Sequence, residues 1–222
     1  HALEENLLVE LAAVIHDPVT TTDELIPSGE TSSYRSNPLR LAEFTLSRRV
    51  PEYVGLSKKI AAQENDRRSG VVSAHLREVL SQVGDADELA KCTQFGSAVF
   101  ANKPGDGSAR EQAASCQKVL GGFANICYEF ATKRYRSNCI NWGILPFTLD
   151  KDTPFDYQPG DCVFVPGIRR AIESGLEDIP AKVLLAGGGT EDITLHVKGL
   201  TSDEQEIILD GCLMNYYAKR VN

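Results

Sequence analysis

GDGSAREQAA, residues 105–114, decides the local fold, because two glycines run directly into an amphipathic helical pattern. The apolar run GSAVFA at 96–101 precedes it and predicts a strand. After the glycines, Ala113, Cys116, Val119 and Leu120 recur at spacings of three and four, which is the pattern of a helix with one apolar face. Strand, glycine turn and helix are therefore the expected local structure.

This turn also has the features of an anion site. A helix start offers unpaired backbone N–H groups and the positive end of the helix dipole. Gly105 and Gly107 allow close approach of the backbone to a ligand, Arg110 can hold a carboxylate through two hydrogen bonds, and Ser108 lies within reach. A phosphate loop is excluded because no Gly-Lys-Ser/Thr follows, and the dinucleotide fingerprint because Arg110 replaces its third glycine. The alternative is that the turn is purely structural.

Five stretches together resemble the C-terminal, or swivel, domain of the aconitase family. GDGSAREQAA is similar to that family's GxGSSREHAA segment. Four others agree in order and spacing: TTTDELIPSG (20–29) with TTDHI, YRSNP (34–38) with LRSNIP, FATKRYRSNCINWGILPF (130–147) with SFARIHxxNLxxxGLLPL, and LTSDEQEIILDGCLMNYY (200–217) with LTxxExxIIxxGGLLNY. The wording is most similar to the uncharacterised hydratase branch of the aconitase and isopropylmalate isomerase superfamily. The resemblance implies a swivelling β/β/α domain over 1–222, an α/β fold with a mixed sheet or barrel and flanking helices, as a fragment or subunit of a larger hydratase.

The resemblance also implies roles for individual residues. Ser108 matches the serine that abstracts the substrate proton as an alkoxide, and Asp23 matches the active-site Asp of TTDHI. Arg110 and Arg35 match substrate-binding arginines, and Gly107 lies in the turn that approaches the substrate. A serine is too weakly acidic for this role unless fixed positive potential surrounds it, which the helix start and Arg110 would supply.

Two positions depart from the family pattern. Ala109 stands where the family has a second serine that hydrogen-bonds the substrate, and losing that bond removes roughly 1.5–3 kcal/mol of binding. The substrate is therefore expected to differ from citrate. Glu24 stands where aconitases have a histidine, whose role does not carry over, and His16, His75 and His196 are expected to be isolated surface or core residues.

Composition limits the class of partner. The chain has 222 residues and a formal net charge of -8, which argues against nonspecific nucleic-acid binding. An acidic substrate would need local arginines to hold it against the overall charge. LLVELAAVI at 7–15 is too short and too interrupted to span a bilayer and has no basic segment before it, so neither a membrane span nor a signal peptide is expected. Because the chain opens with His1, the natural polypeptide is expected to extend further toward its N-terminus.

The six cysteines are spread singly, without a C-x-x-C pair or a Cys/His cluster of metal-ligand spacing. They are expected to be reduced core thiols of a cytoplasmic protein. The resemblance implies a 4Fe-4S cluster in the complete enzyme, which residues outside this chain must bind. Cluster-bearing domains would then be joined in cis or supplied by a large subunit, and the isolated chain would be inactive.

Regular elements are expected along the whole chain. Strand-like runs lie at 7–15, 96–101, 123–128, 144–149, 161–166, 182–186 and 192–197, and helical patterns at 38–46, 73–83, 110–120, 131–139 and 202–212. The polar stretch 57–68 predicts a charged helix or a solvated excursion, and AGGGTED at 186–192 predicts a hairpin loop. Trp142 is expected to cap the 131–139 helix and pack on the core.

Three functional classes remain open at this point: a catalytic swivel domain, a degenerate relative that binds an acid or partner without turnover, and an unrelated binding module.

Overall fold

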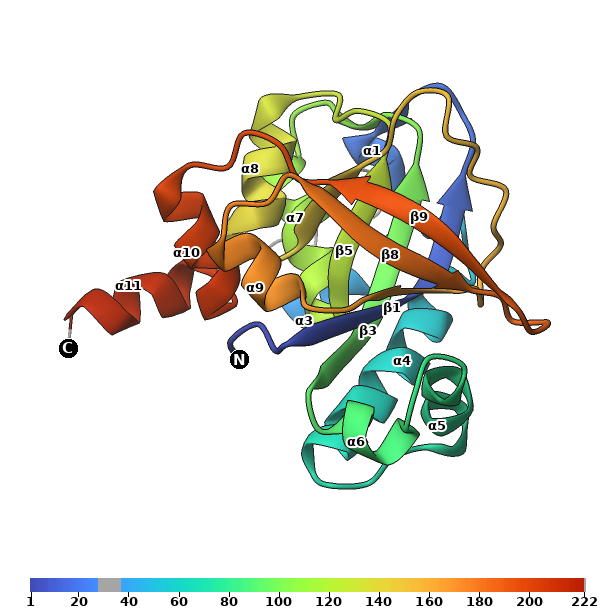
Figure 1. Cartoon of the computed structure of the whole chain (residues 1–222). Helices are drawn as coiled ribbons and strands as arrows, with labels where there is room; N and C mark the ends of the chain where they lie inside the picture. The colour runs from blue at the N-terminus through green and yellow to red at the C-terminus, as the bar shows by residue number, and fades with distance from the viewer. Residues whose placement is uncertain (28–36, 222) are drawn as a thin grey trace.

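The computed structural model describes residues 1–27 and 37–221. Seven strands of this described part close into a barrel in the order β1-β3-β5-β6-β9-β8-β7. They are β1 (Asn6–Ile15), β3 (Thr93–Ala101), β5 (Gly122–Cys127), β6 (Leu145–Thr148), β7 (Cys162–Val165), β8 (Asp178–Leu184) and β9 (Thr190–His196). The run β1-β3-β5-β6 is parallel, whereas β6-β9-β8-β7-β1 is antiparallel. The mixed α/β fold with flanking helices is therefore confirmed (Figure 1).

Helices cover the barrel on several sides (Figure 1). They are α1 (Thr22–Leu25), α3 (Pro38–Ala42), α4 (Tyr53–Arg68), α5 (Ala74–Ser81), α6 (Ala86–Ala90), α7 (Arg110–Val119), α8 (Lys133–Asn141), α9 (Ile168–Glu173), α10 (Ser202–Asp210) and α11 (Leu213–Val221). In Figure 1, α4, α5 and α6 lie together below the barrel, and α11 projects from the body next to α10. None of the helices in the described ranges is long and apolar enough to cross a membrane.

Strand β1 is buried on both faces, which explains its almost continuously apolar sequence. Leu7, Val9 and Leu11 belong to the cluster inside the barrel, whereas Leu8 lies in the cluster under α4, α5 and α6. Further along the strand, Ala13 joins a third cluster with α3, α7 and α8. Because alternate side chains face two covered surfaces, no position of β1 had to be polar for solvent.

The polar stretch 57–68 forms most of α4 and packs on the barrel. Ser57, Ile60, Glu64 and Arg67 are buried at spacings of three and four, so they share one helix face. Arg67 bonds Glu64 and also Glu4, which precedes β1. Of the two predicted alternatives, a charged helix and a solvated excursion, the helix is correct. Its buried face carries ion-paired side chains in place of a continuous apolar stripe.

Several predicted boundaries were wrong. The predicted helix 38–46 ends at Ala42, and turns follow from 43 to 49. Among them, Leu46 has a left-handed φ of 55°, and its N–H donates to the carbonyl of Leu25. The predicted strand 182–186 begins earlier, at Asp178, because its first half alternates exposed and buried residues around Pro180. The predicted hairpin is confirmed, since β8 and β9 pair antiparallel, but its loop is shorter than the predicted 186–192 because β9 begins at Thr190.

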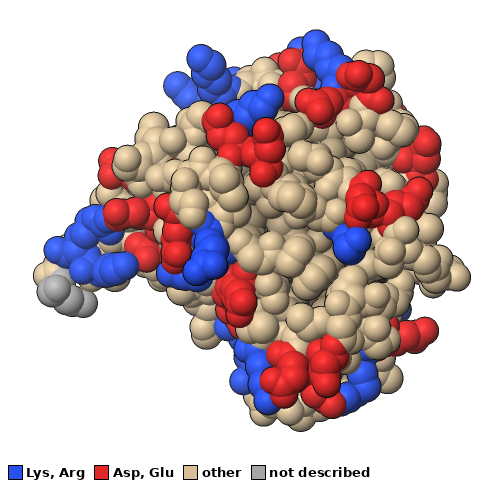
Figure 2. Space-filling view, viewed as in Figure 1, with Lys and Arg blue, Asp and Glu red and all other residues tan. Residues whose placement is uncertain are grey.

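Charged side chains of both signs are interspersed on the face shown in Figure 2, with broad uncharged areas between them. This face carries no continuous basic tract of the kind that binds a nucleic-acid backbone.

Candidate active-site loop

A short parallel pairing brings together two segments that the sequence analysis singled out separately. Strand β2 (Thr20–Thr21) pairs with β4 (Pro104–Asp106), with Thr20 opposite Pro104 and Thr21 opposite Asp106. Thr21 then caps α1, because its hydroxyl accepts a hydrogen bond from the N–H of Glu24 at 3.2 Å. The TTTDEL segment therefore lies beside the glycine turn that leads into α7.

The two glycines of this turn have left-handed backbones, with φ of 101° at Gly105 and 132° at Gly107. A Cβ atom at Gly107 would overlap the Oγ1 of Thr22, and one at Gly105 would overlap the ring of Tyr135. Both glycines are thus required by contacts within the chain. The approach of Gly107 to a substrate stays a prediction.

Ser108 is exposed directly before α7. Ala109 is the N-cap of this ten-residue helix and provides no side-chain hydrogen bond to its first N–H groups. Arg110 begins the helix, and its Nε is buried without a hydrogen-bond partner in the described chain. The N-terminal end of α7 therefore presents the exposed hydroxyl of Ser108 and backbone N–H groups without a side-chain cap. It also presents the Arg110 guanidinium, whose Nε is an unused donor.

Asp23 lies in α1, and its half-exposed carboxylate is 3.7 Å from the guanidinium of Arg48. The neighbouring Glu24 has one buried carboxylate oxygen, Oε2, without a hydrogen-bond partner in the described chain. Arg35, the second predicted substrate-binding arginine, lies outside the described residues.

A buried polar group beneath the turn was missed by the sequence analysis. The hydroxyl of Tyr135 accepts hydrogen bonds from Gln117 Nε2 at 2.9 Å and from Asn125 Nδ2 at 3.3 Å. Tyr135 is fully buried, and this burial raises the pKa of its hydroxyl. Thr132 caps α8 just before it, by accepting from the N–H of Tyr135. The sequence signal for this hydrogen-bonded group was Asn125, because a polar residue in the apolar strand 122–127 needs a buried partner.

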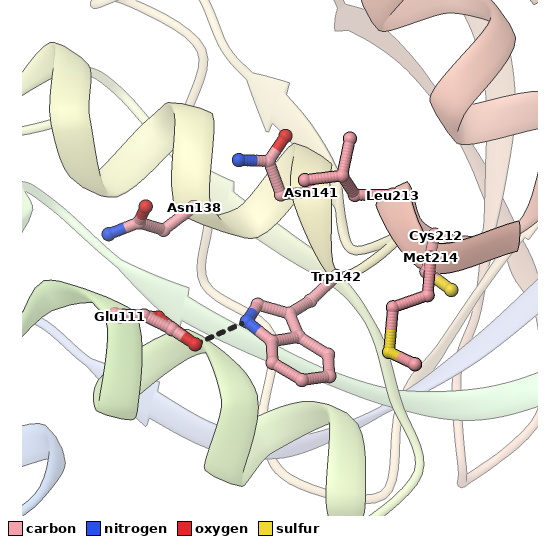
Figure 3. A pocket seen from close by; sticks show the side chains of 7 residues that line it. All are labelled: Glu111, Asn138, Asn141, Trp142, Cys212, Leu213 and Met214. Carbon is pink, nitrogen blue, oxygen red and sulfur yellow. Dashed lines mark hydrogen bonds between the residues drawn. The ribbon is translucent and has the colours of Figure 1, made fainter. Parts of the chain in front are cut away.

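A hollow of about 320 Å³ lies between α7, α8 and α11 (Figure 3). Trp142 follows the last residue of α8 and caps it, because its backbone N–H donates to carbonyls of the last turn, which confirms the predicted cap. Its ring packs against the core, and its indole N–H donates to Glu111 at 3.1 Å. Leu213 and Met214 line the opposite wall.

The cysteines lie largely as predicted, whereas two histidines that were expected to be isolated have carboxylate partners. All six cysteines are free and four are buried, and burial raises the pKa of Cys116 to about 11 and that of Cys139 to about 12. His196 is not isolated, because its ring nitrogens lie 2.7 Å from Asp178 and 3.1 Å from Asp150. His75 is also paired, with Glu10 at 2.5 Å.

Among the described residues, no three His, Cys, Asp or Glu side chains lie close enough together to hold a metal ion. The donor set of the described chain therefore does not fit an iron–sulfur cluster.

Comparison with known proteins gives one family model and a consistent set of relatives. The model of the aconitase C-terminal domain matches residues 54–152. The chain is 33% identical over 133 residues to the 3-isopropylmalate dehydratase small subunit of Metallosphaera sedula, covering 60% of this chain and 71% of that protein. It is 25% identical over 124 residues to aconitate hydratase A of Bradyrhizobium diazoefficiens, covering 53% of this chain but 13% of that protein.

A solved structure shares the fold at a lower identity. The crystal structure of 3-isopropylmalate dehydratase from Methanocaldococcus jannaschii superimposes with a TM-score of 0.54 at 22% identity, covering 97% of this chain and 95% of that one. This likeness extends over the whole barrel and its flanking helices.

Proposed function

Because the chain belongs to the family of aconitase C-terminal domains, whose members are parts of hydro-lyases, we propose that it is a substrate-binding and base-supplying swivel domain. The complete enzyme would be an iron–sulfur-dependent hydratase or dehydratase of a hydroxy-di- or tricarboxylic acid. The observation that carries this proposal is the β2–β4 pairing, which places α1 beside the exposed Ser108 at the start of α7.

Ser108 would take the proton from the carbon next to a substrate carboxylate. Its alkoxide form needs positive potential, which the uncapped N–H groups of α7 and the guanidinium of Arg110 can supply. This potential has to be local, since the chain as a whole carries a net charge of -8.

The substrate carboxylates would bind to the arginines. The buried Nε of Arg110 is a donor that still needs an acceptor, and a carboxylate provides one. Arg35 would hold a second carboxylate, the N–H of Gly107 would face the substrate, and Asp23 would accept a hydrogen bond from it. Ala109 provides no hydroxyl at the position next to Arg110, so the preferred acid would differ from that of aconitases.

The remaining machinery would lie in another part of the enzyme. The chain spans only 13–15% of the aconitate hydratases that it matches, while its dehydratase relative is named a small subunit. We therefore propose that a 4Fe-4S cluster, which acts as a Lewis acid toward the departing hydroxyl in this family, is held by domains in cis or by a large subunit.

The test replaces Ser108 in the complete enzyme. Ser108→Ala should abolish turnover with little effect on folding, since it removes the proton acceptor from an exposed position. Ser115→Ala is the matched control, because Ser115 lies within α7, away from the glycine turn, and donates a hydrogen bond to the carbonyl of Gln112. If Ser108→Ala keeps most of its kcat, the base is elsewhere and the proposal fails at its centre.

A degenerate binding module is the second candidate, and Ala109 and Glu24 are the departures that favour it. Anaerobic iron reconstitution of the complete protein, followed by a screen of hydroxy-di- and tricarboxylic acids, separates the two candidates. Turnover of any acid supports the hydro-lyase, whereas saturable binding without turnover supports the degenerate module.

A further inference from the structure

Lys118 is a charged residue that the hydro-lyase proposal does not use. It lies in the last turn of α7, at the opposite end from Ser108, and is partly buried. Its Nζ is 4.4 Å from the centre of the Phe123 ring. It also lies against Gly143, where an added Cβ would be 3.4 Å from it. In the described chain no carboxylate lies within ion-pair distance of this ammonium, so the aromatic ring is its main partner.

Lys118 lines a cavity of about 280 Å³ between α4, β3 and the start of α11. Arg68 lies in the same cavity, but Glu64 and Glu4 balance its charge at 3.4 Å and 3.6 Å. The amide side chains of Asn65 and Asn215 complete the polar part of the wall. The cavity therefore combines an unbalanced amine with hydrogen-bonding groups and room for a small molecule.

The surroundings also favour the neutral form of the amine. Burial lowers the pKa of Lys118, Cys212 partly opposes this shift and the charge of Arg68 adds to it, which together bring the pKa to about 8. The other ionisable groups that line the cavity are Glu64, which is engaged by Arg68, and His1. At pH 7 about one tenth of this amine is unprotonated, against roughly one in 3,000 for an ordinary lysine.

We propose that Lys118 is a modification site that is acylated by small acyl phosphates. The cavity volume fits an acyl phosphate of a few carbon atoms, and Asn65 and Arg68 offer donors for its phosphate oxygens. The free amine attacks the carbonyl carbon, the C–N bond forms, and the C–O bond to phosphate breaks. Phosphate leaves with the electron pair and the amine proton, so an amide and inorganic phosphate are the products.

The test uses the chain itself with acetyl phosphate as the probe, followed by tryptic digestion and mass spectrometry. Lys59 is the internal control, because it is exposed on α4 and faces solvent. We expect acetylation of Lys118 at pH 7 to be faster than that of Lys59 by about tenfold or more, as its larger free-amine fraction predicts. The rate at Lys118 should level off above about pH 8, where its amine is already free, while the rate at Lys59 continues to rise.

Two controls keep the proposal falsifiable. A Cys212→Ser variant should be acetylated at Lys118 as fast as the unmodified sequence, because the thiol is not the nucleophile. Loss of the modification in that variant, a rate at Lys118 no greater than at Lys59, or a rate at Lys118 that keeps rising to pH 10 would each overturn the proposal. None of these outcomes depends on hydro-lyase activity.

Discussion

Gly107→Ala should separate helix α1 from the turn that carries Ser108, and its cost can be worked from two features of the site. The φ of 132° is unfavourable for any residue with a Cβ, which costs about 1–3 kcal/mol. The new Cβ would also overlap Thr22 Oγ1 and lie 3.3 Å from Thr22 Cβ, and such overpacking costs about 1–3 kcal/mol. The free energy of unfolding should therefore fall by about 2–6 kcal/mol.

A second substitution separates these two contributions. Thr22→Ala removes Oγ1 and Cγ2, so only Thr22 Cβ at 3.3 Å remains close to the new methyl group. The double variant should recover the steric part, which appears as a coupling free energy of about 1–3 kcal/mol between the two positions. Gly188→Ala is the control for the backbone part, because Gly188 has a φ of 97° and nothing within 4 Å of its missing Cβ.

Urea unfolding followed by far-ultraviolet circular dichroism measures all four variants. A coupling below about 0.5 kcal/mol would show that Thr22 does not lie against Gly107. A loss in Gly188→Ala as large as that in Gly107→Ala would likewise remove the steric contribution. Either result would refute the placement of α1 beside the turn, on which the candidate site depends.

Three further predictions concern other parts of the chain. Ala109→Ser in the complete enzyme should shift kcat/KM toward citrate or isocitrate by up to about a hundredfold, and ratios unchanged within about twofold across a panel of acids would show that this position does not face the substrate. Tyr135→Phe leaves the amide donors of Gln117 and Asn125 without their acceptor, so the free energy of unfolding should fall by about 1–3 kcal/mol. Hydrogen exchange in the glycine turn should also become faster in that variant, and unchanged exchange would mean that the hydroxyl does not support the turn. Because the pKa of Lys118 is about 8 when folded, below its ordinary 10.5, the unfolded chain binds more protons between these values and stability should rise with pH across that window. Lys118→Met should lack this rise, and a parallel pH profile for the two proteins would contradict the shifted pKa.

Local structure could largely be predicted from the sequence. The glycine turn between a strand and a helix, the hairpin at 186–192 and the cap at Trp142 all rest on residues within a few positions of one another. Local backbone preference and side-chain period determine such features. The buried cysteines were predicted for the same reason, because they lie in apolar runs.

The candidate site could be predicted only as separate parts. The family resemblance assigns Ser108, Arg110 and Asp23 to one active site, but nothing in their own spacing shows how the two segments meet. The pairing of β2 with β4 joins them, and a two-residue strand is too short to show a period. The roles of Ser108, Arg110 and Asp23 stay predictions, as does that of Arg35, which lies outside the described residues.

What the sequence determined by itself is the identity of the family motifs and the local elements that carry them. Only the tertiary structure decided the closed order of the barrel strands, the Tyr135 group under the turn and the cavity around Lys118. The physical reason is that these features depend on contacts between residues far apart in the chain. Periodicity reports which face of an element is buried, but not which element covers it.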